Sequence, residues 1–508
     1  MLKITNLSLG FGGPDPVIAE TDCRLDEGQR LLICGEAGSG KTTFLAAAAG
    51  LIPRLIAVPS FGGSVELMGR NISTFSRNEL FRTIGFVSQH LEDQLWDVCV
   101  EDVIAFPMEN RGIDRQIIRD RIYQLIREFE LEALCGRRVL TLSGGERRMV
   151  AVAAAIAAGP SILVMDEPTT GLDPAARARL SGLLKKATQS VSALLLSEQD
   201  PLALLSVIDS IALLRDRQLS AAATPGDILP QDSAWRHAGI LPPLRPRPPR
   251  PSAVTGRPLL AVSKLTTHLA RSEGRPVLKD VEFEVRAGEV LGLIGRNGAG
   301  KTTLFKSLLG LARITSGSLV IDGERANDWT VAARARNIAY VPQNMRHILF
   351  NMTVGEEVVF AITASSGTST DQAILTRAAS TLERYDLSSL AETSPFALSA
   401  RQQALLGLAC ADAAGALVAI VDEPLLARDI KGRRMLELFI STMIESQRAV
   451  MLISHDLELM DDLTTRLMIL DDGAVGFDGK LEEAWQSPAF RQLGWQAPYS
   501  STRVEDMA

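Results

Sequence analysis

"GEAGSGKT" at residues 35–42 and "GRNGAGKT" at residues 295–302 decide how this chain is interpreted. Both stretches fit the pattern GxxxxGK followed by Ser or Thr, and each lies between a short apolar run and a helix-like run. Glycines in such a loop let backbone N–H groups curl around phosphate oxygens, while the N-terminus of the next helix adds positive potential. Each stretch therefore predicts a phosphate-binding loop between a strand and a helix.

The two loops supply the residues that we expect to bind ATP. Lys41 and Lys301 should reach the terminal phosphates, and Thr42 and Thr302 should ligate Mg²⁺. The expected ATP-binding residues are Gly35, Glu36, Ala37, Gly38, Ser39, Gly40, Lys41, Thr42 and Thr43 in the first loop, and Gly295, Arg296, Asn297, Gly298, Ala299, Gly300, Lys301, Thr302 and Thr303 in the second. A glycine-rich turn without a ligand is the alternative, and its recurrence in the same context argues against it.

The other landmarks of the sequence also occur twice. They keep their order and a nearly constant offset, as Lys41, Gln89, Ser143 and Asp166 in the first half and Lys301, Gln343, Ser399 and Asp422 in the second. Isolated motifs that arise by chance would not keep order and spacing, so we predict a duplicated domain. Apolar runs such as "RLLICG" and "SILVMDE" have the length of buried parallel strands, and helical patterns separate them. Each half is therefore expected to be an α/β domain with a mostly parallel sheet.

We expect the domains to be residues 1–241 and 258–508, joined by a linker at residues 242–257. Within the linker, "PPLRPRPPRPSAV" holds six prolines and three arginines and has no periodic apolar face. Such a segment should be an extended, semi-rigid tether. Its arginines either lie in solvent or contact acidic lipid headgroups or a partner protein.

Composition excludes some classes of protein. A chain of 508 residues is long enough for two domains, and its net charge of −7 gives no overall basic field that would point to nucleic acid. The five cysteines are scattered without a CxxC pair, which indicates reduced thiols. No apolar run reaches about 18 residues, so we expect no transmembrane helix.

An acidic pair follows an apolar run in each half, in "LVMDEP" and "AIVDEP". Asp166 and Asp422 can each hold Mg²⁺ through water, and the next residue, Glu167 or Glu423, can polarise the attacking water. The alternative is that an acidic pair after a buried strand only caps a helix. The paired phosphate loops favour the catalytic interpretation.

A phosphate loop, a glutamine after an apolar strand, LSGG, a DEP strand end and a terminal SHD together resemble the ABC ATPase family, over nearly all of both halves. The resemblance implies ATP hydrolysis with ATP and Mg²⁺ as cofactors. It also implies that each domain adds an antiparallel β subdomain and a helical signature subdomain to its mostly parallel sheet. In that family two such domains face each other head to tail, and each ATP lies between one phosphate loop and the other domain's signature.

The resemblance also assigns roles to single residues. Gln89 and Gln343 match the glutamine that senses Mg²⁺, the attacking water and the membrane partner, and His455 matches the switch histidine, which Gln199 replaces in the first half. Phe11 is expected to stack on adenine, whereas the second half offers only His268 and Leu269 there. The two signatures are Ser143, Gly144, Gly145 and Glu146 in the first half, and Ser399, Ala400, Arg401 and Gln402 in the second.

The altered residues all fall in one of the two composite sites that this arrangement implies. The second phosphate loop would meet the intact signature, and that composite site would also contain Glu423 and His455. The first loop would meet Ala400 and Arg401 in place of the signature glycines, and its domain carries Gln199. Arg401 can still pair with phosphate. The "GLD" at residues 171–173 is likewise intact, whereas "ARD" at residues 427–429 keeps only its aspartate. We therefore expect one hydrolytic site and one site that binds ATP with little hydrolysis, although the retained Glu167 leaves slow turnover open.

The segment "HLEDQLWDVCVEDVIAFPMEN" after Gln89 resembles the corresponding part of energy-coupling factor (ECF) ATPases. "MTVGEEVVFAI" at residues 352–362 is a weaker version, and "MRHILF" after Gln343 lacks the acidic-Gln pair. This resemblance implies a peripheral protein at the cytoplasmic face of the cell membrane that drives uptake of a micronutrient such as a vitamin or a metal ion. Its partners would be a transmembrane coupling protein and a substrate-binding membrane protein, docked near Glu92, Asp93 and Glu101.

Two other interpretations stay open. One is a soluble ABC protein that acts on ribosomes or nucleic acid, although ribosome-acting members usually carry a long charged helical linker, and the linker here is short and proline-rich. The other is the duplicated ATPase of a sugar importer, a group that also has one weakened half. The "EDQLW" segment argues against the second.

Overall fold

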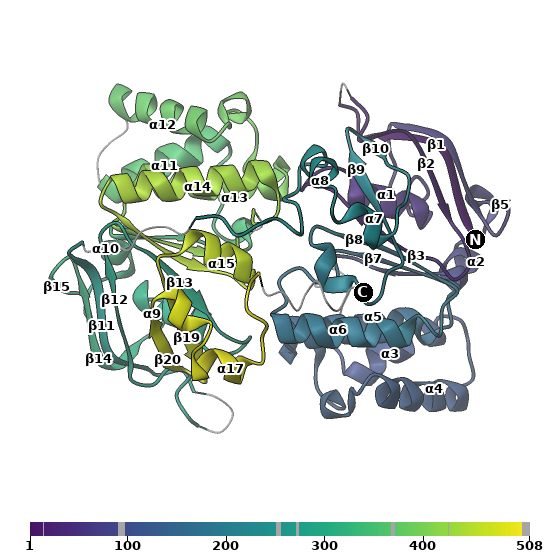
Figure 1. Ribbon diagram of the computed structural model, residues 1–508, viewed down its shortest axis with the longest axis horizontal. Coiled ribbons are helices and arrows are strands. Elements are labelled where there is room, and N and C mark those ends of the chain that lie inside the picture. The colour runs from purple at the N-terminus through teal and green to yellow at the C-terminus, as the bar shows by residue number, and fades with distance from the viewer. Residues whose placement is uncertain are drawn as a thin grey trace. The chain divides into compact units, whose positions relative to one another are not determined.

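The computed structural model describes residues 1–13, 15–89, 97–249, 256–270, 274–366, 371–424 and 426–499. The chain forms two compact units, Met1–Arg245 and Pro246–Glu505 (Figure 1). The boundaries at residues 241 and 258 stay a prediction. Across the described residues, no helix is long and apolar enough to cross a membrane.

The first unit contains two sheets. The antiparallel sheet has the order β2-β1-β4-β5, made of β1 (Leu2–Gly10), β2 (Ile18–Leu25), β4 (Ser60–Leu67) and β5 (Arg70–Asn71). The second sheet has the order β10-β9-β3-β8-β7-β6, made of β3 (Arg30–Cys34), β6 (Ile84–Val87), β7 (Ile162–Asp166), β8 (Ala193–Glu198), β9 (Ser210–Arg215) and β10 (Gln218–Leu219). Its strands are parallel except β10, which pairs antiparallel with β9.

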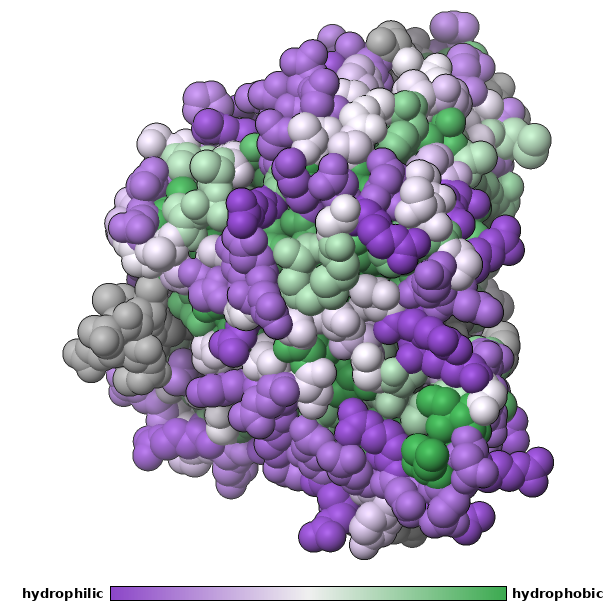
Figure 2. Space-filling view, turned by 90° about the vertical axis from the view of Figure 1, so that its right-hand side faces the viewer, coloured by the Kyte–Doolittle hydropathy of each residue, from purple (hydrophilic) through white to green (hydrophobic). Residues whose placement is uncertain are grey.

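The helices of the first unit are α1 (Lys41–Ala48), α2 (Arg77–Thr83), α3 (Val100–Glu109), α4 (Arg115–Glu128), α5 (Gly144–Ala157), α6 (Pro174–Ala187), α7 (Pro225–Ile228) and α8 (Asp232–His237). Helices α3, α4 and α5 lie together and form the helical subdomain that begins at the signature (Figure 1). Figure 2 shows the side of this unit that lies at the right of Figure 1. Hydrophilic side chains dominate that surface, and apolar ones occur in small groups between them.

The second unit repeats this plan. Its antiparallel sheet has the order β12-β11-β14-β15, made of β11 (Pro258–Thr267), β12 (Val281–Arg286), β14 (Ile314–Ile321) and β15 (Glu324–Arg325). Its mostly parallel sheet has the order β16-β17-β18-β13-β19-β20, made of β13 (Val290–Ile294), β16 (Ile338–Val341), β17 (Val418–Asp422), β18 (Ala449–Ile453), β19 (Arg466–Asp471) and β20 (Ala474–Gly479). The strand order is the one found in the first unit, which confirms the duplication.

The helices of the second unit are α9 (Lys301–Leu308), α10 (Val331–Ala335), α11 (Val354–Ser366), α12 (Gln372–Arg384), α13 (Ala400–Ala414), α14 (Ile430–Glu445), α15 (Leu457–Leu463), α16 (Leu481–Ala484) and α17 (Pro488–Leu493). Helices α11, α12 and α13 form its helical subdomain (Figure 1). The predicted fold is thus confirmed in both units: a mostly parallel sheet, an antiparallel sheet and a helical subdomain.

The central strands are apolar on both faces because both faces are covered. Along β7, Leu163 and Met165 belong to a core that includes α5 and α6, whereas Ile162 and Val164 belong to a core that includes α1 and the antiparallel sheet. This two-sided burial explains why the strands read as continuous apolar runs rather than alternating ones. It leaves only the strand ends to carry polar groups.

The linker contacts the second unit at Arg247. The guanidinium Nε lies 2.7 Å from Asp461 Oδ2, and the charged group lies 5.3 Å from the ring centre of Tyr499. The sequence left a solvated arginine or a lipid or protein contact open for this segment. The structure instead pairs Arg247 with a carboxylate of the domain that follows it.

Asp412 on α13 has a buried carboxylate that accepts from several side chains, and removing it should destabilise the second unit. Its carboxylate accepts from Arg384 at 2.7 Å, Arg448 at 2.8 Å and the Tyr385 hydroxyl at 3.3 Å. Removing one member of a buried ion pair leaves an uncompensated charge, so Asp412→Ala should cost about 3 kcal/mol. Chemical denaturation of the full chain measures this loss. Glu383→Ala, at an exposed carboxylate of α12, is the control, and equal midpoints for the two variants would contradict the expectation.

Candidate functional site

Each phosphate loop connects a central strand to a helix at the carboxyl edge of the parallel sheet. Gly40 has φ 102° and directly precedes α1, and Gly300, with φ 110°, directly precedes α9. A side chain at Gly35 would approach the carbonyl oxygen of Leu214 to 2.8 Å, so only glycine fits there. The sequence therefore has glycine where the backbone must turn tightly toward an anion at the helix N-terminus.

The lysine of each loop lies over the loop itself. Lys41 Nζ donates to the carbonyl oxygens of Gly35 at 2.9 Å and Glu36 at 3.1 Å. Lys301 Nζ does the same with Gly295 at 2.6 Å and Arg296 at 3.1 Å. Both ammonium groups therefore lie where the pattern GxxxxGK places the phosphates of a nucleotide.

The structure brings Thr42 and Asp166 together, as expected for a metal site. Thr42 Oγ1 donates to Asp166 Oδ2 at 2.6 Å, and Ser197 Oγ donates to the other carboxylate oxygen. Burial raises the pKa of Asp166. In the second unit Asp422 accepts from the Tyr340 hydroxyl at 3.0 Å, and burial raises its pKa as well. Hydroxyl and carboxylate oxygens of this kind fit the ligand preference of Mg²⁺.

Glu167 lies at the centre of a group of predicted site residues in the first unit. Its carboxylate accepts from Gln89 Nε2 at 2.8 Å and from Gln199 Nε2 at 3.5 Å, and it lies 3.3 Å from Lys41 Nζ. Arg148 donates to the Glu167 carbonyl oxygen at 2.8 Å. The sequence did not identify Arg148, because a helical arginine two positions after the signature gives no local signal.

Glu423 has different neighbours in the second unit. His455 Nε2 lies 3.4 Å from Glu423 Oε1 and 3.1 Å from Asn297 Oδ1, and the His455 backbone N–H donates to Glu423 Oε2 at 3.2 Å. The imidazole therefore links the carboxylate to the phosphate loop. Gln343 is exposed and, in the described part of the chain, does not bond to Glu423 as Gln89 bonds to Glu167.

The sheet register shows that Gln199 and His455 occupy equivalent positions. Asp166 pairs with Ser197 and Asp422 pairs with Ile453, so Gln199 and His455 each lie two positions beyond the strand partner of the aspartate.

Phe11, directly after β1, has half of its side chain exposed, as a base-stacking ring requires. His268 is exposed too, but its Nδ1 lies 3.1 Å from the Arg313 carbonyl oxygen.

Both signatures begin a helix with a capping box. Ser143 and Glu146 exchange backbone-to-side-chain bonds at the start of α5, and Ser399 and Gln402 do so at the start of α13. The serine and the residue three positions later therefore have a structural role in both halves. The difference between the halves lies in the two residues between them.

Arg401 has a partner inside its own domain. Its guanidinium donates to Asp429 Oδ2 at 3.0 Å, and Asp429 is fully buried. The sequence suggested phosphate as the partner. In the first unit a side chain at Gly145 would lie 3.0 Å from Ala176 Cβ, and the second unit has Gly432 in place of that alanine. Arginine and glycine have thus replaced glycine and alanine as a pair.

The altered "ARD" segment likewise makes stabilising contacts inside its own domain. Arg428 is buried, and its guanidinium lies 2.9 Å from Asp456 and 2.8 Å from Glu458 at the start of α15. Leu172 occupies the corresponding place in the first unit, inside an apolar core.

Of the predicted docking carboxylates, Glu92 and Asp93 lie outside the described residues, and Glu101 accepts from the Gly136 N–H at 2.8 Å.

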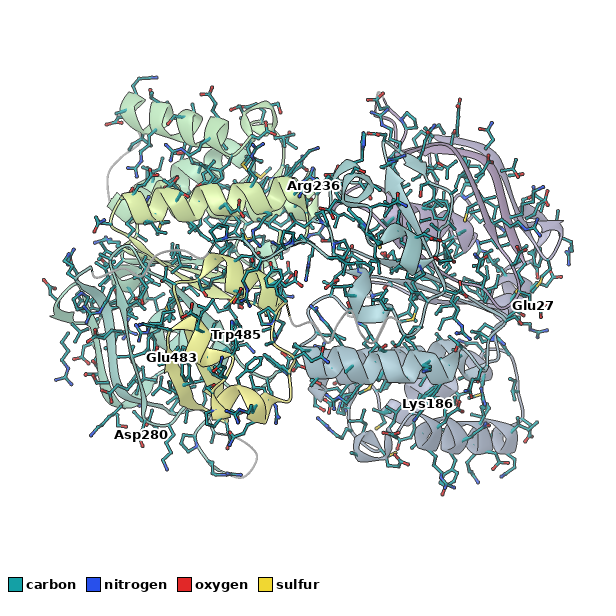
Figure 3. All side chains as sticks on the ribbon, viewed as in Figure 1. Glu27, Lys186, Arg236, Asp280, Glu483 and Trp485 are labelled. Atoms are coloured by element: carbon teal, nitrogen blue, oxygen red, sulfur yellow. The ribbon has the colours of Figure 1, made fainter. Side chains whose placement is uncertain are left out.

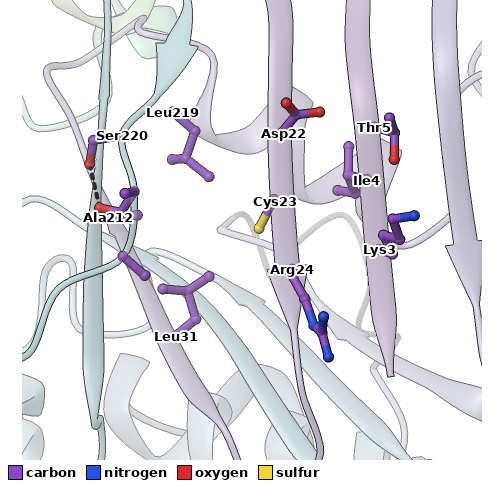
Figure 4. A pocket seen from close by; sticks show the side chains of 12 residues that line it. Lys3, Ile4, Thr5, Asp22, Cys23, Arg24, Leu31, Ala212, Leu219 and Ser220 are labelled. Carbon is purple, nitrogen blue, oxygen red and sulfur yellow. Dashed lines mark hydrogen bonds between the residues drawn. The ribbon is translucent and has the colours of Figure 1, made fainter.

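A separate pocket of about 500 Å³ lies between β1, β2 and the edge of the parallel sheet in the first unit (Figure 4). None of the predicted site residues lines it. Burial raises the pKa of the Cys23 thiol in its wall to about 12, so this cysteine is no nucleophile at neutral pH. The pocket is therefore distinct from the nucleotide chemistry.

Phosphate loop, carboxylate pair and signature helix define each unit as a P-loop ATPase domain. The sequence model described as "ABC transporter" matches residues 18–170 and 278–426, which is more than half of the chain. The chain therefore belongs to the ABC transporter family and is a tandem ABC ATPase, and membership implies ATP binding and hydrolysis.

Known relatives span nearly the whole chain. A "Putative ABC transporter ATP-binding protein" of Methanosarcina acetivorans is 28% identical over 521 residues, covering 93% of this chain and 84% of that protein. One of the same description from Streptomyces avermitilis is 29% identical and covers 96% of both. The structure described as "Model of ribosome-bound archaeal Pelota and ABCE1" is similar with a TM-score of 0.68 at 20% identity, covering 98% of this chain and 85% of that chain. At this identity the likeness concerns the fold alone.

Glu198 is a buried carboxyl group that the sequence did not single out. It accepts from the Thr169 N–H at 2.7 Å and from the Gln199 N–H at 3.2 Å, and it is almost fully buried. Burial and the neighbouring Glu167 charge raise the pKa of Glu198 to about 7. The carboxyl thereby holds the loop between Glu167 and the "GLD" at residues 171–173.

Glu198→Gln should weaken the pH dependence of stability. The unfolded chain releases the Glu198 proton near pH 4.5 and the folded chain near pH 7, so the folded form binds more protons between these values. The free energy of unfolding therefore falls as pH rises through this window, and the amide removes that loss. Urea unfolding at the two ends of the window measures it, with the exposed Glu27 changed to Gln as control (Figure 3). Parallel pH profiles for wild type and Glu198→Gln would contradict the expectation.

Proposed function

We propose that this chain is the ATP-hydrolysing subunit of an ABC importer of the ECF type, which drives uptake of a micronutrient such as a vitamin or a metal ion. The observation that carries the proposal is that His455 contacts both Glu423 and Asn297 of the second phosphate loop. ATP hydrolysis needs a positioned base beside the terminal phosphate, and this arrangement supports that chemistry.

In this proposal Glu423 polarises the water that attacks the terminal phosphate. His455 holds the carboxylate through its backbone N–H and its ring, and it reaches the phosphate loop through Asn297. Lys301 would bind the terminal phosphates, and Thr302 and Asp422 would hold Mg²⁺. The metal would neutralise charge that develops on the phosphate oxygens.

We further propose that the first phosphate loop binds ATP with little hydrolysis. In the family's head-to-tail arrangement this loop meets Ser399, Ala400, Arg401 and Gln402. Ala400 adds a methyl group where the first signature has Gly144, and the charge of Arg401 is already engaged by Asp429. Gln199 cannot titrate as a histidine does. Glu167 and Gln89 are nevertheless in contact, which supports nucleotide binding at this site.

Coupling to transport rests on other support. The relatives are described as transporter ATP-binding proteins, and the segment after Gln89 is ECF-like. After Gln343, exposed apolar side chains gather at Phe350, Met352 and Phe360, with the two phenylalanine rings 4.8 Å apart. Such a group favours an apolar partner. The localisation at the cytoplasmic face of the membrane is part of this proposal.

A soluble, ribosome-acting ATPase is the second candidate, since the structural neighbour is described as ribosome-bound. Co-purification of the tagged full chain from detergent-solubilised membranes separates the two. A membrane subunit whose association is lost in Phe350→Asp/Met352→Asp supports transport. Ribosomes or nucleic acid in its place overturn it. The sugar-importer alternative is tested by which substrate the captured complex accumulates.

Glu423→Gln should remove most ATPase activity. A positioned general base contributes roughly 10²–10⁴-fold, so turnover should fall by that factor. Glu167→Gln is the matched control in the other domain and should cost far less. Steady-state phosphate release measures both, and near wild-type turnover in Glu423→Gln would refute the assignment.

Nucleotide trapped during turnover should differ between the two loops. Photo-crosslinked nucleotide analysed after cleavage in the linker should be ATP beside Lys41 and ADP beside Lys301. The reason is that Glu423 and His455 belong only to the second loop's domain. ADP in equal amount on both halves would count against the asymmetry.

A further inference from the structure

We propose that Trp495 is a positioning residue for His455, held in place by the segment that follows α17. The proposal rests on the role of His455 in the proposed function and adds the residue that fixes its ring. Nothing in the sequence motifs points to Trp495, which lies in the last part of the second unit.

The indole and the imidazole form an edge-to-face pair. Their ring centres are 5.9 Å apart and their planes are inclined by 80°. Both side chains are buried, with 7% of Trp495 and 4% of His455 exposed. Aromatic pairs in this geometry gain energy beyond their buried area. Trp495 therefore restricts rotation of the His455 ring through this ring contact, while Glu423 and Asn297 contact the ring at Nε2.

The indole N–H makes no hydrogen bond within the described residues. Trp495 Nε1 is buried and has no hydrogen-bond partner there. A buried indole N–H usually finds a partner, so an unpaired one needs an explanation. The ring contact with His455 provides a reason for a tryptophan at this position.

The first unit provides an internal comparison. The tails "AWRHAGILPPL" and "AFRQLGWQAPY" correspond to each other, which places Ile240 where the second unit has Trp495. Ile240 is a core residue, and Gln199 occupies the histidine position. The aromatic partner thus occurs in the domain that has the histidine and is replaced in the domain that lacks it.

Both tails lie beside their own phosphate loop. In the first unit the Glu36 N–H donates to the Ala238 carbonyl oxygen at 3.2 Å, and in the second the Arg296 guanidinium donates to the Gln492 carbonyl oxygen. Packing against the loop is therefore common to the two tails. The contact with the switch position by an aromatic ring is specific to the second.

The segment that carries Trp495 is anchored on both sides. Tyr499 donates to Asp462 at 2.7 Å, and Arg247 pairs with the fully buried Asp461, which also accepts from the Trp485 indole at 2.8 Å (Figure 3). Both aspartates lie on α15, which begins two residues after His455. The anchors thus keep the tail and the switch residue in one unit, and preorganisation of this kind is what a reacting group requires.

The test is the ATPase kinetics of the full chain. Trp495→Leu keeps an apolar side chain without the ring and should lower kcat about tenfold, which is less than the roughly 10²–10⁴-fold contribution of a positioned acid-base group because His455 itself is retained. The KM for ATP should stay unchanged, because the phosphate loop is intact. Trp495→Phe should recover most of the rate. Trp329→Leu, at a partly buried tryptophan outside the site, should leave kcat unchanged and serves as control.

A double-mutant cycle separates positioning from packing. In a His455→Ala background, Trp495→Leu should have no further effect on kcat, because the ring it orients is gone. An equal factor in both backgrounds, or an unchanged kcat in Trp495→Leu, would overturn the inference. If His455→Ala itself keeps full activity, the proposed role of His455 fails instead. The His455 ring resonance, assigned among five histidines, should also shift in Trp495→Leu while the thermal transition shows a folded chain.

Discussion

A single backbone hydrogen bond at the edge of each sheet determines where the chemistry is placed. The Glu167 N–H donates to the Ser197 carbonyl oxygen at 3.1 Å, and the Glu423 N–H donates to the Ile453 carbonyl oxygen at 2.9 Å. Each bond extends the parallel ladder one residue beyond the strand and accompanies a positive φ, 43° and 47°. A bulky residue adopts this conformation only when its surroundings impose it. The carboxylate is thereby turned toward the phosphate loop at the same strand edge.

The parts of this arrangement that follow local rules were predictable from sequence. Glycine positions, apolar runs and the acidic pairs are short-range signals, and they gave the loops, the central strands and the duplication. The partners of Arg401 and Arg428 were not predictable, because Asp429 and Glu458 lie about 30 positions away along the chain and no periodicity links them. For the same reason Ser197, Tyr340 and Arg148 were missed. Sequence shows which residues could bind phosphate, but not which of them already have partners.

The two halves have diverged by paired replacement rather than by loss. The second signature keeps its capping box, and the altered Arg401 is bonded to the buried Asp429. In its "ARD" segment, Arg428 forms an ion pair at the start of α15 where the first unit has the apolar Leu172. The fold of the second domain therefore does not depend on signature glycines.

The Arg401–Asp429 pair also limits the evolutionary paths open to this chain. A mutation that restored glycine at position 401 would leave the fully buried Asp429 without its cation, and such a loss typically costs about 1–3 kcal/mol. Restoring alanine at position 432 first would place a methyl group against Leu426. Either substitution alone should therefore destabilise the second unit, so positions 401 and 432 constrain each other. Glycine at position 401 should be tolerated best when position 432 changes with it.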